Sequence, residues 1–137
     1  MSNVNLMKDQ IRVMSEESAD AVAARYRDDA VYVDNARGLT FKGKEEITAM
    51  VRELKEAFSN IHAADAEYYE TGDWTITRFQ GRGTNDGPFG PLPATGKTID
   101  VPMCELFRWQ DGKIVEGVIY YDSATMMIQL GHMSPPA

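Results

Sequence analysis

The chain has little of several residue types that mark whole classes of proteins. It contains one cysteine, Cys104, so no internal disulfide can form, which fits a reducing compartment. Its two histidines, His62 and His132, are far apart in the sequence, and no metal-ligand cluster is predicted. Basic residues are in the minority, with 14 Lys and Arg against 21 Asp and Glu. The resulting net charge of −7 repels phosphate backbones, so nucleic acid is not an expected partner.

Long hydrophobic runs are also absent. No stretch is apolar enough to span a bilayer, and the N-terminal sequence MSNVNLMKDQ lacks the basic segment and apolar run of a secretory signal. We therefore expect a cytoplasmic protein with no membrane partner. With 137 residues, of which 43% are hydrophobic, the chain is long enough for one domain with its own core.

The strongest local signal is a hairpin near the C-terminal end. Asp111-Gly112 separates the apolar runs KTIDVPMCELFRW and IVEGVIYYD, and this dipeptide favours a tight turn because the turn requires positive φ. With the turn centred there, Trp109 lies opposite Ile114. The further predicted pairs are Phe107 with Glu116, Glu105 with Val118, Met103 with Tyr120, and Val101 with Asp122.

This register predicts an apolar sheet face that carries three carboxylates, Glu105, Glu116 and Asp122. The apolar residues of the face are Ile99, Val101, Met103, Phe107, Trp109, Ile114, Val118 and Tyr120. Carboxylates on an otherwise apolar face indicate either a wet rim or a functional pocket.

Periodicity and turn residues predict the other elements. Helices are expected over residues 6–14, 16–27 (with Ser15 as N-cap), 44–58 and 123–130 (with Gly131 as C-cap). Strands are expected over residues 30–34, 39–42, 60–70 and 73–84, followed by a Pro- and Gly-rich loop over 85–96. Helices early and antiparallel strands late predict the α+β class, with a curved, mostly antiparallel sheet wrapped around helices.

Five segments, taken in order, carry a resemblance to a known family. They are DDAVYVDNARGLTFKGKEEI, Gly83-Thr84, GPFGPLPATGK, DGKIVEGVIYYD and QLG. Together they resemble the SnoaL-like polyketide cyclase family, which has the cone-shaped α+β fold known from nuclear transport factor 2. The resemblance covers residues 15–131, so we expect one domain over residues 1–137 with residues 132–137 as a C-terminal tail.

The resemblance implies an apolar cavity between sheet and helices, acid/base catalysis on a small hydrophobic oxygenated molecule, no cofactor and no metal, and a homodimer. It also implies that Asp122, at the end of the last strand, is the catalytic acid/base. Next to Tyr120, Met103 and Val101, the Asp122 carboxyl would be partly desolvated, which would raise its pKa. The alternative for Asp122 is an N-cap of the helix that starts at Ser123.

The chain departs from the family pattern at two places. Relatives often carry His after the Gly-Thr pair, where this chain has Asn85. They often carry His-Arg or Trp in the middle of the last strand, where this chain has Gly117 and Val118. The loss of imidazoles removes the easiest proton-transfer partners for Asp122. A non-catalytic small-molecule-binding protein is therefore a second hypothesis.

A third hypothesis is a proton shuttle like that of the ketosteroid isomerases of the same fold. The segment DDAVYVDNARG resembles theirs and places the shuttling carboxylate at Asp34, for which the alternative is a turn-forming Asp before Asn35. For Glu105 we favour an ion pair with an arginine of a neighbouring strand, and the aromatic residues can equally be core. The expected substrate-binding residues are Tyr120, Met103, Glu105, Tyr32, Asp34, Trp74 and Phe89.

Overall fold

The Asp111-Gly112 turn joins two long antiparallel strands in the computed structural model, which describes residues 2–136. Both turn residues have positive φ, 51° and 75°, as a tight two-residue hairpin requires. The strands are β1 (Tyr26–Asp34), β2 (Leu39–Lys42), β3 (Phe58–Thr71), β4 (Trp74–Asn85), β5 (Thr98–Gln110) and β6 (Lys113–Tyr121). They form one sheet in the order β2-β1-β6-β5-β4-β3, in which only the β1–β6 pair is parallel.

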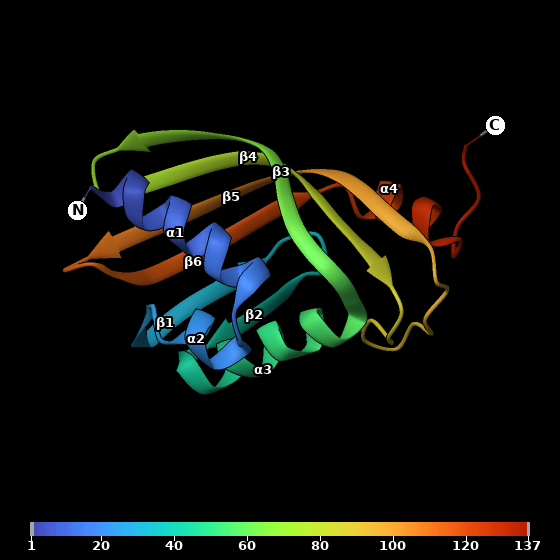
Figure 1. Cartoon of the computed structure of the whole chain (residues 1–137), viewed down its shortest axis with the longest axis horizontal. Coiled ribbons are helices and arrows are strands. Elements are labelled where there is room, and N and C mark those ends of the chain that lie inside the picture. Colours follow the sequence, from blue (N-terminus) through green and yellow to red (C-terminus); the bar gives the residue numbers. More distant parts are fainter. Residues whose placement is uncertain (1, 137) are drawn as a thin grey trace.

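Four helices accompany the sheet (Figure 1): α1 (Asn3–Glu16), α2 (Ala19–Ala23), α3 (Gly43–Ala57) and α4 (Ser123–Leu130). Helix α1 packs against β3 and β4, α3 packs against β1 and α2, and α4 packs against β5. This arrangement confirms the predicted α+β class, with a curved, mostly antiparallel sheet wrapped around helices. Met1 and Ala137, the limits of the expected domain, lie outside the described residues.

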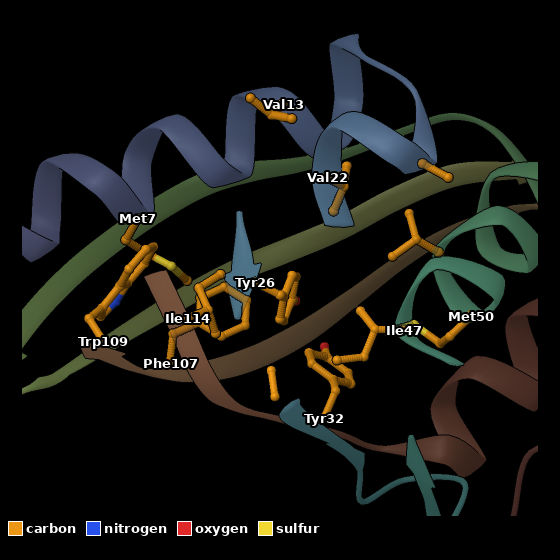
Figure 2. Close-up of a cluster of buried hydrophobic side chains, with 13 residues drawn as sticks. Met7, Val13, Val22, Tyr26, Tyr32, Ile47, Met50, Phe107, Trp109 and Ile114 are labelled. Atoms are coloured by element: carbon orange, nitrogen blue, oxygen red, sulfur yellow. The ribbon is translucent and has the colours of Figure 1, made fainter. Parts of the chain in front are cut away.

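The main core cluster lies between the inner face of the sheet and helices α1 to α3. Figure 2 shows Tyr26, Tyr32 and Phe107 side by side in it, and the Phe107 ring centre lies 5.9 Å from that of Tyr26 and 6.3 Å from that of Tyr32. A second cluster, which includes Phe58 and Phe89, extends to α4.

The predicted helix over residues 16–27 is wrong in its extent. Helix α2 covers only five residues, and its N-cap is Ser18 rather than Ser15, because the Ser18 hydroxyl accepts a hydrogen bond from the Ala21 N–H at 3.1 Å. The chain is already in β1 at Tyr26, whose ring is 2% exposed. Tertiary packing of this ring on the sheet overrides the local helical pattern.

The predicted register of the last hairpin is correct only next to the turn. Trp109 does pair with Ile114, but Arg108 then pairs with Glu116, so Val115 is the extra residue of a β-bulge. Every later pair is shifted by one, which places Gly117, Ile119 and Tyr121 opposite Phe107, Glu105 and Met103. A shift of one residue turns a strand over, so Glu116, Val118, Tyr120 and Asp122 do not share the face of Glu105.

No helix within residues 2–136 has the length and hydropathy needed to cross a membrane.

Candidate active site

A cavity of about 140 Å³ lies between the concave face of the sheet and helices α1 and α3. Most residues that line it are apolar, and the polar ones are Gln10, Tyr26, Tyr32, Asp34, His62, Arg82, Glu105 and Tyr121. An apolar cavity of roughly 150 Å³ can hold a single benzene ring. The cavity therefore has the size of a one-ring molecule.

Two carboxylates on different strands border this cavity. Glu105, in the middle of β5, pairs with Thr77 of β4 on one side and with Ile119 of β6 on the other. Asp34 of β1 also pairs with Ile119. The two carboxylates thus stand in one row across the sheet, two strands apart, which corresponds to roughly 10 Å between their backbones.

The surroundings of Glu105 alter its proton affinity. Glu105 lines the cavity, and its carboxylate accepts a hydrogen bond from the Tyr32 hydroxyl. Burial raises the pKa of Glu105 from 4.5 to about 7, although the Tyr32 hydrogen bond acts in the opposite direction. Near neutral pH both protonation states are populated, so this side chain can donate or accept a proton.

The ion pair that we favoured for Glu105 is not formed: within residues 2–136 its carboxylate is hydrogen-bonded to Tyr32 and contacts no arginine as an ion pair. Its polar neighbours include Tyr32 and Tyr26, and Thr77 pairs with it on β4. Burial, together with the charge of Glu105, holds the pKa of both Tyr26 and Tyr32 well above the ordinary value. Both phenols therefore stay protonated near neutral pH, and Tyr32 serves as a hydrogen-bond donor.

Tyr32 can reach Glu105 because residue 117 has no side chain. In the sheet, Gly117 lies between Tyr32 on β1 and Phe107 on β5. A Cβ atom at position 117 would lie 2.6 Å from Tyr32 Cδ2 and 2.8 Å from Phe107 Cε1, closer than such contacts allow. The departure from the family pattern at Gly117 is thus a packing requirement of the Tyr32–Glu105 pair.

Asp34 is buried at the end of β1, with 5% of its surface exposed. Its carboxylate accepts hydrogen bonds from the Arg37 Nε (2.8 Å), the Arg37 backbone N–H (3.1 Å) and the Tyr121 hydroxyl (3.2 Å). The bond to the Arg37 backbone closes the turn over residues 35–38, as the turn-forming interpretation predicted. The side chain also borders the cavity, so the geometry is compatible with both interpretations of Asp34.

Asp122 has surroundings opposite to those predicted. It is exposed, and its carboxylate caps α4 by accepting hydrogen bonds from the Ala124 N–H (2.9 Å), the Thr125 N–H (3.3 Å) and the Thr125 hydroxyl (2.9 Å). These bonds lower the pKa of Asp122 instead of raising it. The N-cap alternative is confirmed, and the expected desolvation of Asp122 is wrong because strand β6 ends at Tyr121.

The structure brings five of the residues predicted to act on substrate to the cavity: Tyr32, Asp34, Phe89, Met103 and Glu105. The other three lie elsewhere. Trp74 begins β4 at the opposite end of the sheet, Tyr120 is 50% exposed on the outer face, and Asp122 caps α4.

Gln10, Tyr26 and Tyr121 also line the cavity, although they are not among the predicted substrate-binding residues. Gln10 was detectable, because it interrupts the apolar stripe of Met7, Ile11 and Met14 on the first helix. Tyr26 was missed because it fell in the incorrect helix. Tyr121 was considered as a pocket residue, but the register without the bulge placed Tyr120 instead of Tyr121 on the face of Glu105.

Asn85, which stands where relatives often have His, fixes the loop that carries Phe89. It is 1% exposed, and its Nδ2 donates to the carbonyls of Ala57 (3.1 Å) and Gly87 (2.9 Å). Its Oδ1 accepts from the Thr95 N–H at 2.9 Å. Both polar atoms of this side chain are therefore hydrogen-bonded, and these bonds fix the loop that brings Phe89 to the cavity.

Among residues 2–136 no group of three or more His, Cys, Asp or Glu side chains is placed to hold a metal ion.

A curved six-stranded sheet that encloses a cavity against its helices defines the fold class of ketosteroid isomerase and nuclear transport factor 2. The family described as SnoaL-like polyketide cyclase matches residues 5–130. The chain therefore belongs to the SnoaL-like polyketide cyclase family.

Solved structures with the same fold are similar over nearly the whole chain. A candidate polyketide cyclase from Pseudomonas putida has a TM-score of 0.87 and 21% identity, with 95% of this chain and 98% of that one covered. IdmH, a candidate polyketide cyclase from Streptomyces antibioticus, has a TM-score of 0.80 and 23% identity, with 96% and 99% covered. A hypothetical protein from Catenulispora acidiphila, solved in complex with trimethylamine, has a TM-score of 0.80 and 22% identity, with 95% and 97% covered. No curated protein matched the chain.

Proposed function

We propose that this protein is a cofactor-independent acid/base catalyst that moves a proton at a carbon beside a carbonyl in a small hydrophobic, oxygenated molecule. The observation that carries the proposal is Glu105, a carboxyl group with a pKa of about 7 in the wall of an apolar cavity. A general acid/base works best when its pKa lies near the working pH. Glu105, rather than the exposed Asp122, is therefore the proposed catalytic residue.

In the proposed step, ionised Glu105 accepts a proton from the carbon beside the carbonyl. The C–H bond breaks, an O–H bond forms on Glu105, and the electron pair moves to the carbonyl oxygen as an enolate. Glu105 then returns the proton, either to another carbon or to the oxygen that forms when the enolate carbon closes a ring on a second carbonyl. The hydrogen bond from Tyr32 holds the carboxyl in place, and the apolar wall limits water.

The size of the cavity supports a substrate of about one ring or a chain of similar volume. This is smaller than a fused multi-ring polyketide. The trimethylamine in the Catenulispora acidiphila protein is also a small molecule, which fits a fold that binds ligands of this size. We therefore propose a small ketone or β-dicarbonyl compound as the substrate class.

Asp34 supports a second candidate, the ketosteroid-isomerase-like proton shuttle. It borders the same cavity, and the Arg37 guanidinium and the Tyr121 hydroxyl hold its carboxylate in a fixed orientation. The non-catalytic binding protein uses the same cavity without turnover. The homodimer, the cytoplasmic location and a catalytic role for Asp122 stay predictions.

The test follows exchange of the protons beside the carbonyl of cyclohexanone in D₂O by NMR, in the wild type and in Glu105→Gln, Asp34→Asn and Asp122→Asn. We expect the wild type to exceed the buffer rate, Glu105→Gln to lose about 100-fold or more of the enhancement, and Asp122→Asn to retain it. Loss in Asp122→Asn with retention in Glu105→Gln would instead support the first prediction for Asp122. Loss confined to Asp34→Asn would support the shuttle.

A carboxyl-carbon NMR titration tests the electrostatic basis separately, with Glu105→Gln used to assign the Glu105 signal. A midpoint near 7 supports the proposal. A midpoint near the ordinary value of 4.5 contradicts it, whatever the exchange rates are.

A further inference from the structure

Gln10 of α1 is a polar side chain in an apolar position. It is 3% exposed, and it lines the cavity together with Ile11 and Met14 of the same helix. Its amide acts to lower the pKa of the Tyr26 phenol, against the larger effect of burial, which raises that pKa.

The carbonyl oxygen of the same amide accepts no hydrogen bond in the described part of the chain. Gln10 Oε1 is buried and has no hydrogen-bond partner among residues 2–136. A buried acceptor without a partner costs free energy, and such groups in native structures call for a specific explanation. A bound molecule that supplies a donor is one such explanation when the acceptor lines a cavity.

Two other buried atoms share this condition in the described part of the chain, Arg25 Nε and Thr77 Oγ1. Neither residue lines the cavity. Of the three residues with such an atom, Gln10 is therefore the one that borders the cavity.

From this geometry we infer that Gln10 Oε1 recognises a hydrogen-bond donor, a hydroxyl group, on a neutral one-ring ligand in the cavity. The ring fits the volume of about 140 Å³, and the hydroxyl supplies the bond that Oε1 lacks. Two features favour a neutral molecule: the walls are largely apolar, and ionised Glu105 repels anions. An analogue without the hydroxyl leaves Oε1 unpaired, and sites of this kind reject such analogues strongly.

This inference rests on the proposed function only in taking the cavity as the binding site, and it does not require proton transfer by Glu105. It adds a requirement that the carbonyl chemistry does not make, namely a donor on the ligand. The substrate class becomes a small hydroxylated ketone or phenol-like compound.

The test compares the binding of phenol and toluene, two one-ring molecules of similar size, by NMR titration. The quantity measured is the ratio of the toluene Kd to the phenol Kd, because the comparison of this ratio between variants cancels the difference in hydration. In Gln10→Met, which replaces the amide with an apolar chain of similar length, we expect the ratio to fall about tenfold. In Leu6→Met, a change on the same helix at a residue that does not line the cavity, the ratio stays as in the wild type.

A second variant protects the test against misfolding of Gln10→Met, which removes a polar neighbour of Tyr26. Gln10→Met combined with Tyr26→Phe replaces both polar groups with apolar ones, a change that proteins tolerate better. The same fall in the ratio is expected in this double variant.

Three results would overturn the inference. An unchanged ratio in both Gln10 variants shows that Oε1 does not bind the hydroxyl. A fall in Glu105→Gln but not in the Gln10 variants assigns the hydroxyl to Glu105, which leaves the proposed function intact. Failure of the wild type to bind either molecule removes the cavity as a site and contradicts both proposals.

Discussion

Glu105 and Asp122 show how the surroundings of a carboxylate decide what it can do. Both were placed on one apolar face by the sequence, but only Glu105 borders the cavity. Burial raises the pKa of Glu105 to about 7, whereas hydrogen bonds from α4 lower the pKa of Asp122. The same chemical group is therefore suited to proton transfer in one place and to capping a helix in the other.

The raised pKa of Glu105 predicts how stability depends on pH. The folded state binds this proton more tightly than the unfolded state, so the free energy of unfolding falls as pH rises from about 4.5 to about 7. A pKa shift from 4.5 to about 7 corresponds to a loss on the order of 3 kcal/mol over that window. In Glu105→Gln we expect this slope to disappear, as measured by urea unfolding at a series of pH values.

The control for this prediction is Glu70→Gln, which removes an exposed carboxylate of the same type at the end of β3. It should keep the wild-type slope between pH 4.5 and pH 7. A wild-type slope in Glu105→Gln would mean that the proton is bound by another group.

At the scale of elements, the sequence predicts whether a segment is a helix, a strand or a turn better than it predicts how two strands pair. The Asp111-Gly112 turn, helix α4 and its C-cap at Gly131 were all predicted from turn and cap chemistry, which is local. The bulge at Val115 was not, because strict alternation was assumed along the strand. The two consecutive apolar residues Ile114 and Val115, both buried, were the available signal of it.

Strand β6 supplies a prediction of its own through Gly117. In Gly117→Ala the new methyl group meets two rigid rings, so we expect a loss of about 1–3 kcal/mol in the free energy of unfolding. Displacement of Tyr32 also removes a hydrogen bond that lowers the pKa of Glu105, so that pKa should rise further. Urea unfolding and the Glu105 carboxyl titration measure the two effects.

Gly81→Ala is the matched change on β4, which lies on the other side of β5 from β6. There the new methyl group meets the Cε and Sδ atoms of Met103, a flexible chain end that can rotate away. Its cost should be the smaller of the two, with no change at Glu105. Equal effects in both variants would argue against a specific role of Gly117.

At the scale of the whole molecule, the order of elements and the family resemblance were enough to predict the fold class and a cavity. The size of the cavity was not predictable, because it results from how Tyr26, Tyr32 and Phe107 pack between sheet and helices (Figure 2). Long-range packing also decided which polar side chains reach the cavity. Gln10 and Glu105 come from α1 and β5, far apart in the chain, and the sequence alone could not bring them together.

The cavity predicts that filling it raises the free energy of unfolding and lowers the affinity for a ligand. Ala63 of β3 lines it, and Ala63→Leu places extra apolar atoms in otherwise empty space. We expect the free energy of unfolding to rise by about 1–2 kcal/mol, because apolar surface is buried without displacing packed neighbours. Phenol affinity should fall about tenfold or more, since the space is no longer free.

The control is Ala64→Leu. Ala64 does not line the cavity, so this change should leave phenol affinity unchanged. Unaltered phenol binding in Ala63→Leu would place the ligand outside this cavity.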